Sequence, residues 1–174
     1  SLGEPLPAAK KNVSGGESEA GITGSGQPPL PLLENEKVIA RVKQEEQQGI
    51  VERYTAAAVK FIKANKEKPF FLYLPHTAVH FPLYPGKAFQ KKSNNGLYGD
   101  WVEEVDWSVG QVLDAVRELK LDQQTLVIFT CDHGEQLGDH HLLGKIGYFD
   151  ESYRIPMIIR DPRAEANATR GTIV

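Results

Sequence analysis

The residues best suited to bind a metal ion and an anion lie in one stretch, residues 125–145. Thr125–Thr130 is apolar and rich in β-branched residues, which predicts a strand covered on both faces. Asp132 and His133 follow at its C-terminal end, where open α/β sheets bind ligands. A carboxylate offers a hard oxygen ligand and a neutral imidazole offers a nitrogen ligand, while Lys145 is a cation suited to an anionic substrate.

The same residues have a plainer interpretation. Asp132-His133-Gly134 is also a good turn sequence, in which the aspartate would cap its own backbone. A second pair of imidazoles, His76 and His80, lies in a proline-containing loop, and loop histidines are often simple surface residues. The residue types and spacing therefore leave both a binding site and a turn open.

The stretch resembles the C-terminal signature of the sulfatase and phosphonate monoester hydrolase branch of the alkaline phosphatase superfamily. In that family a strand ends in Asp-Asn or Asp-His, both metal ligands, and a later Gly-Lys supplies a lysine that faces the sulfate or phosphonate group. Here these positions read Asp132, His133, Gly144 and Lys145. The Asp-His pair and the sequence around Lys145 are more similar to the phosphonate hydrolase branch.

An earlier segment resembles the arylsulfatase branch instead. Sulfatases carry Lys-Pro-Phe-Phe-Leu-Tyr and then a loop that ends in His-x-Pro, and residues 68–73 and His80-Phe81-Pro82 match both parts. The resemblance implies that His80, rather than His76, contacts the substrate and can donate a proton to the leaving group.

Helices and strands alternate along the chain, which predicts an α/β fold with a mostly parallel sheet flanked by helices. Apolar spacing predicts a helix over 45–65 and a second from residue 98 or 99 to 119. In the second helix we expect Glu103 and Glu104 to face water and Asp106 to make a structural hydrogen bond. The predicted strands are 69–74, 125–130 and 154–160.

Composition predicts the two ends of the chain, and the resemblance implies the domain between them. Residues 1–27 are rich in Gly, Ser and Pro and are expected to be flexible; 28–163 form a partial sulfatase-like domain; 164–174 form a polar tail. The net charge of −3 gives no general attraction to nucleic acid, and no apolar run is long enough for a membrane span. The sequence leaves the cellular location undecided. The resemblance implies an extracellular, periplasmic or lysosomal location for an arylsulfatase and a cytoplasmic one for a phosphonate hydrolase.

The nucleophile that the resemblance requires is absent. The family makes a formylglycine within Cys/Ser-x-Pro/Ala-x-Arg; Cys131 is followed by Asp-His-Gly, and no serine has that context. No Asp-Asp pair completes the metal site either. We therefore expect a chain that lacks the N-terminal half of the hydrolase domain and is inactive alone. It is either a fragment of a larger hydrolase or a stand-alone remnant or chimera.

Several questions stay open at this stage. The substrate is a sulfate or a phosphonate ester, and the metal is Ca²⁺ or Mn²⁺. Two alternatives to a sulfate or phosphonate ester hydrolase are also open. The chain could be a non-enzymatic α/β module with a vestigial site, or a phosphatase-like relative.

Overall fold

The computed structural model describes residues 29–163, so the predicted flexible segment 1–27 and polar tail 164–174 lie outside the described residues. The chain divides into two compact units, Ser1–Ala115 and Val116–Val174, here called the first and second unit. The predicted metal ligands and Lys145 belong to the second unit, and His80 belongs to the first.

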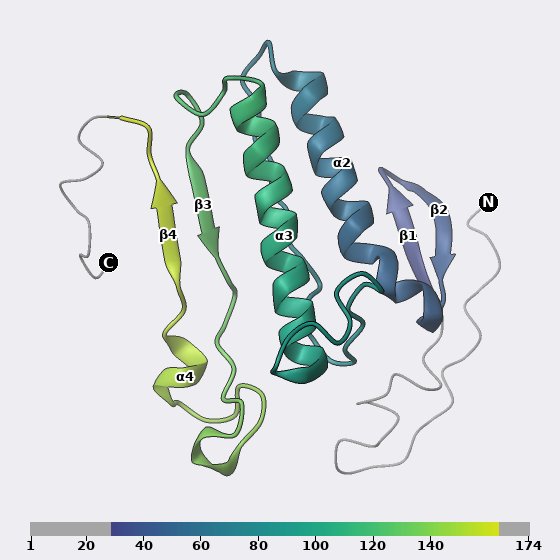
Figure 1. Cartoon of the computed structure of the whole chain (residues 1–174), viewed down its shortest axis with the longest axis vertical. Helices are drawn as coiled ribbons and strands as arrows, with labels where there is room; N and C mark the ends of the chain where they lie inside the picture. Colours follow the sequence, from purple (N-terminus) through teal and green to yellow (C-terminus); the bar gives the residue numbers. More distant parts are fainter. Residues whose placement is uncertain (1–28, 164–174) are drawn as a thin grey trace. The chain divides into compact units, whose positions relative to one another are not determined.

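The first unit begins with an antiparallel hairpin of β1 (Leu30–Glu34) and β2 (Lys37–Val42) (Figure 1). Its two-residue turn contains Asn35, whose φ of 54° lies in the left-handed region that asparagine tolerates better than most residues. A β-bulge interrupts the pairing between Leu32 and Leu33.

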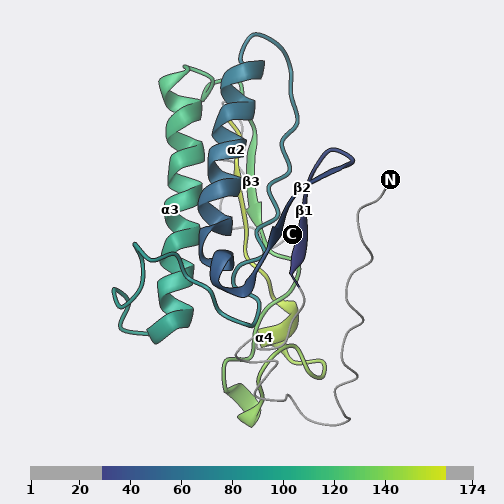
Figure 2. The same cartoon turned by 90° about the vertical axis from the view of Figure 1, so that its right-hand side faces the viewer.

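Two helices follow and lie side by side in both views (Figures 1 and 2). The predicted helix 45–65 is confirmed as a 3₁₀ turn, η1 (Gln44–Gly49), that continues into α2 (Ile50–Asn65). The second predicted helix is confirmed as α3 (Gly96–Glu118). The buried face of α2 includes Val51, Ala58 and Ile62, each at most 3% exposed, so the spacing of three and four residues places one stripe in the core.

The buried face of α3 differs from the prediction. Glu104, expected to face water, is fully buried, because its carboxylate accepts the backbone N–H of Gly86 at 2.7 Å. Val102, by contrast, is exposed. Asp106, expected to make a structural hydrogen bond, is exposed, and the buried aspartate on this helix is Asp100.

The second unit holds two strands and two short helical turns. These are β3 (Val127–Thr130), η2 (Asp139–His141), α4 (Asp150–Tyr153) and β4 (Met157–Arg160). Strands β3 and β4 pair antiparallel, with Ile128 opposite Ile159 and Phe129 opposite Ile158.

The predicted mostly parallel sheet is not confirmed, because both strand pairs among the described residues are antiparallel. The predicted strand 69–74 pairs with no other segment among residues 29–163 and has no regular secondary structure. The prediction that β3 is covered on both faces is also wrong for this chain. Residues that pair across two strands lie on the same face of the sheet, so Ile128 and Ile158, which pair with different residues, lie on opposite faces. Both are exposed, by 54% and 61%.

Candidate metal and anion site

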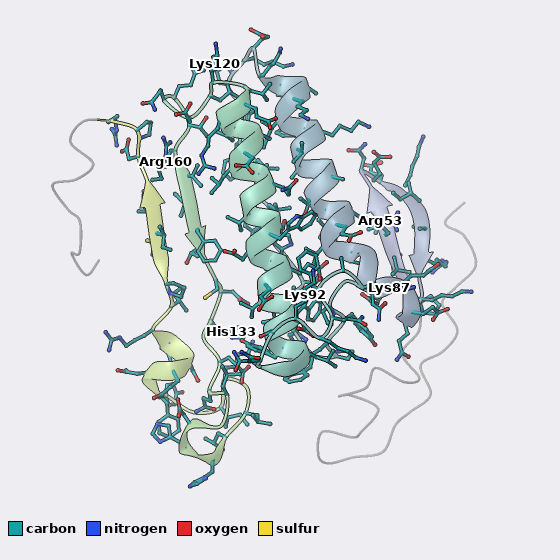
Figure 3. All side chains as sticks on the ribbon, viewed as in Figure 1. Arg53, Lys87, Lys92, Lys120, His133 and Arg160 are labelled. Atoms are coloured by element: carbon teal, nitrogen blue, oxygen red, sulfur yellow. The ribbon has the colours of Figure 1, made fainter. Side chains whose placement is uncertain are left out.

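The candidate site begins where β3 ends. Asp132 and His133 follow the strand directly, and Figure 3 shows His133 on the loop that leaves it. The chain then makes a long loop before it enters α4. Because β3 ends at Thr130, both side chains lie just beyond the end of the strand and outside the sheet.

Backbone contacts close this loop on itself. Gly134 N donates to Ser152 O at 2.9 Å, and Gln136 N donates to Gly144 O at 3.0 Å. The carboxylate of Glu135 accepts the N–H of Gly144. A Cβ on Gly134 would lie 1.9 Å from the carbonyl oxygen of Glu151, so only glycine permits this approach of the strand exit to α4.

Hydrogen bonding fixes which nitrogen of His133 is available. Its Nδ1 lies 2.7 Å from the carbonyl oxygen of Gly134, which can only accept, so Nδ1 carries the proton. In the neutral ring Nε2 therefore keeps its lone pair, and it lies 3.6 Å from Oδ2 of Asp132. A backbone carbonyl that orients a histidine in this way is typical of metal-ligating imidazoles.

The neighbours of Asp132 favour its charged form. Its pKa lies below the ordinary value mainly because its own backbone N–H donates to the carboxylate, and the backbone N–H of His133 and the charge of Lys145 lower it further. Burial and the adjacent Asp132 raise the pKa of the Cys131 thiol, so this residue stays protonated and is a poor metal ligand.

A pocket of about 170 Å³ brings three predicted site residues together. Asp132, His133 and Lys145 line it, and the remaining wall comes from Ser152, Tyr153 and Ile155. The pocket combines a carboxylate, an imidazole lone pair and an ammonium group, which can receive a cation and an anion side by side. Sequence reasoning missed Ser152, because nothing in the local sequence distinguishes it from a loop residue.

The donor set fits part of a metal site. A carboxylate and a neutral imidazole suit a divalent ion, but such ions take four or more ligands. Among residues 29–163 no three His, Cys, Asp or Glu side chains gather at one point. The described residues thus supply two candidate ligands at this point, Asp132 and His133.

The two loop histidines lie in the first unit. His80 is exposed, and its Nδ1 lies 2.6 Å from the carbonyl oxygen of Phe81, so its Nε2 is again the available nitrogen. His76 is partly buried, and burial lowers its pKa. Its Nε2 lies 3.2 Å from the hydroxyl of Ser108, which in turn lies 2.6 Å from that of Thr55. These contacts give His76 a structural link to α2 and α3.

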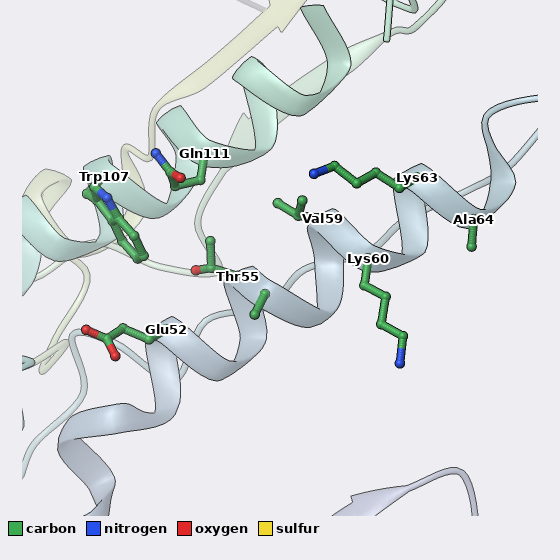
Figure 4. Close-up of a pocket in the computed structure, with 9 residues that line it drawn as sticks. Glu52, Thr55, Val59, Lys60, Lys63, Ala64, Trp107 and Gln111 are labelled. Atoms are coloured by element: carbon green, nitrogen blue, oxygen red, sulfur yellow. The ribbon is translucent and has the colours of Figure 1, made fainter. Parts of the chain in front are cut away.

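A larger hollow lies between α2 and α3 in the first unit (Figure 4). Its volume is about 690 Å³, and Thr55, Val59 and Trp107 contribute to its wall. None of the residues predicted from the sequence to bind metal or substrate lines it.

Comparison with known proteins decides the family. The sulfatase family profile matches residues 19–173, most of the chain. The chain belongs to the sulfatase family. This sulfatase chain is 40% identical to human steryl-sulfatase over 128 residues, which are 66% of this chain and 22% of that protein. It is 55% identical over 64 residues to PehA of Trinickia caryophylli, a multifunctional alkaline phosphatase superfamily protein, covering 37% of this chain and 12% of PehA.

A solved structure carries the same fold. The PsFucS1 sulfatase from Pseudoalteromonas sp. matches with a TM-score of 0.61 at 26% identity, over 67% of this chain and 25% of that one. The match therefore spans about a fifth of human steryl-sulfatase and a quarter of the PsFucS1 sulfatase. Steryl-sulfatase is a sulfuric ester hydrolase, and the sulfatase family is metal-dependent. No helix within residues 29–163 is long and apolar enough to cross a membrane.

Proposed function

We propose that this chain is the part of a metal-dependent hydrolase of sulfate esters or phosphonate monoesters that carries half of the metal site and a contact for the substrate anion. The observation that carries the proposal is the shared pocket of Asp132, His133 and Lys145 at the exit of β3. Both substrate classes present a tetrahedral oxyanion, so the same residues suit either one.

The roles follow from the chemistry of each group. Asp132 and His133 Nε2 would hold one side of a Ca²⁺ or Mn²⁺ ion, and the imidazole favours Mn²⁺. Such an ion would supply positive charge to offset the charge on the ester oxygens. Lys145 would pair with the anionic group, and the family resemblance gives His80 the role of proton donor to the leaving oxygen. The nucleophile and the other metal ligands come from polypeptide outside this sequence.

We also propose that the complete hydrolase contains the larger, mostly parallel sheet predicted from the sequence. Both faces of β3 and β4 carry exposed apolar side chains, and the extended residues 69–74 include Phe71 and Tyr73, which are 85% and 75% exposed. Apolar surface of this extent is typical of strands that other segments cover. In the complete hydrolase these strands would join a mostly parallel sheet.

A Mn²⁺ titration followed by NMR tests the half-site. We expect paramagnetic broadening confined to residues around Asp132 and His133, with a dissociation constant of roughly 1 mM, because two ligands in an open pocket bind weakly. Asp132→Ala and His133→Gln should each abolish the effect. The matched control His141→Gln removes an exposed imidazole from the same loop and should leave it unchanged.

Activity assays complete the test. The chain alone, with Mn²⁺ or Ca²⁺, should turn over neither an aryl sulfate nor an aryl phosphonate ester, because it lacks a suitable nucleophile. Turnover by the isolated chain, or broadening that survives Asp132→Ala, would contradict the proposal. Absence of any localised Mn²⁺ effect would favour a non-enzymatic module with a vestigial site.

A further inference from the structure

Ser152 is a buried residue with an unexplained hydroxyl. It lies in α4 and is 3% exposed. Its backbone is fully used: the N–H donates to Phe149 O at 3.0 Å, and the carbonyl accepts Gly134 N at 2.9 Å. Its side-chain oxygen, however, has no hydrogen-bond partner within the part of the chain that the structure describes. Buried hydroxyls are nearly always paired, so an unpaired one calls for a physical reason.

The position of Ser152 supplies a reason. The residue lines the same pocket as Lys145, Asp132 and His133. A hydroxyl that is held by its own backbone loses little entropy when a ligand arrives, since its position is already set. The unpaired hydroxyl of Ser152 is therefore available to form a hydrogen bond with a ligand atom that enters the pocket.

The surrounding charges indicate which kind of atom this is. Asp132 and the lone pair of His133 Nε2 already offer acceptors, which suit a cation. The wall also contains donors, namely the ammonium of Lys145 and the hydroxyls of Ser152 and Tyr153. Of these two hydroxyls, that of Ser152 is buried and has no partner among residues 29–163. A hydroxyl donor beside a cation suits an oxyanion. Tyr153 and Ile155 complete the wall.

We propose that the Ser152 hydroxyl is a substrate-binding group that donates a hydrogen bond to an oxygen of the sulfate or phosphonate moiety held by Lys145. The assignment rests on the proposed function and adds a specific contact to it. It also explains why Gly134 must be a glycine: the close approach of residue 134 to α4 brings Ser152 to the strand exit where the metal ligands lie.

Inorganic sulfate is the probe for this contact. In the full chain, titration at constant ionic strength against sodium chloride should shift the amide signals of Ser152 and Lys145. Ser152→Ala should weaken sulfate binding about tenfold, as expected for one hydrogen bond to a charged group. Lys145→Ala should abolish binding. The control Ser108→Ala removes a buried serine hydroxyl of the first unit and should leave the sulfate affinity unchanged.

Stability separates a ligand contact from a structural one. Because the hydroxyl has no partner to lose among residues 29–163, Ser152→Ala should be at least as stable to urea as the parent chain when sulfate is absent. A marked loss of stability would assign Ser152 to the fold and overturn the inference. Unchanged sulfate affinity in Ser152→Ala, with binding lost in Lys145→Ala, would overturn the serine contact alone. No sulfate response in the parent chain would overturn both the contact and the proposed anion site.

Discussion

Asp100 shows how one carboxylate can organise a loop. Near the start of α3 it is 1% exposed and accepts three backbone N–H groups, from Lys91 at 2.8 Å, Lys92 at 3.0 Å and Ser93 at 2.8 Å. These bonds, that from Ser93 first, hold the pKa of Asp100 below its ordinary value. The carboxylate satisfies donors that the loop could not otherwise pair away from water.

Asp100→Asn should lower the melting temperature by about 5 °C, because the amide group would face one of these N–H donors and leave it unpaired. Asp106→Asn, the same change at an exposed position of the same helix, should shift it by no more than about 1 °C. Differential scanning calorimetry measures both. Equal effects at the two positions would mean that the three N–H contacts add no stability.

The pH dependence of Asp100 has a defined direction. Its folded pKa lies below the unfolded value of 3.8, so the unfolded chain binds the proton more readily as the pH falls. The stabilisation is fully present above the unfolded pKa and is lost as the pH falls through the folded pKa. Asp100→Asn should remove this part of the acid-induced loss of stability.

The connection between β3 and α4 depends on a single glycine. Gly134 brings the strand exit against the backbone of α4, where a Cβ would lie 1.9 Å from the carbonyl oxygen of Glu151. Two short elements, neither of them stable in isolation, are joined there by the Gly134–Ser152 hydrogen bond. The pocket wall that includes Ser152 is thus held by backbone packing.

Gly134→Ala should lower the free energy of unfolding by about 1–3 kcal/mol, the usual cost of forcing an extra methyl group into a packed site. Gly110→Ala is the matched control, since its Cβ would meet nothing within 4 Å. On an α-helix that change should be neutral or stabilise by up to about 1 kcal/mol. Urea denaturation distinguishes them, and a neutral Gly134→Ala would show that α4 moves away at little cost.

At the scale of the whole molecule, residues 29–163 leave many apolar side chains of their strands exposed. The two faces of the β3–β4 pair are both exposed, and the chain matches only about a fifth of human steryl-sulfatase. Large exposed apolar patches favour association with other polypeptide.

The isolated chain should therefore bind the dye ANS. Ile128→Thr combined with Ile158→Thr, which keeps β-branched residues on both faces, should reduce the fluorescence by about half. Ile39→Thr, a single exposed isoleucine of the β1–β2 hairpin, should have a smaller effect. A chain that binds no ANS would contradict the expectation that the strand faces are available to a partner.

The sequence alone predicted the two long helices and the order of the candidate site residues. The periodic apolar residues of α2 and α3 predicted both helices, because helical contacts join residues three and four positions apart. The order of Asp132, His133, Gly134 and Lys145 likewise predicted which groups could meet a metal and an anion, since the residues follow one strand exit.

Other features depended on contacts between segments far apart in the chain. The antiparallel pairing of β3 with β4, the burial of Glu104 against Gly86 and the entry of Ser152 into the pocket all join such segments. Alternation and composition describe a strand or a serine but not its spatial neighbours, and those neighbours set strand direction, burial and hydrogen bonding. The sequence thus predicted the candidate site residues, and the tertiary structure determines which of them line the same pocket.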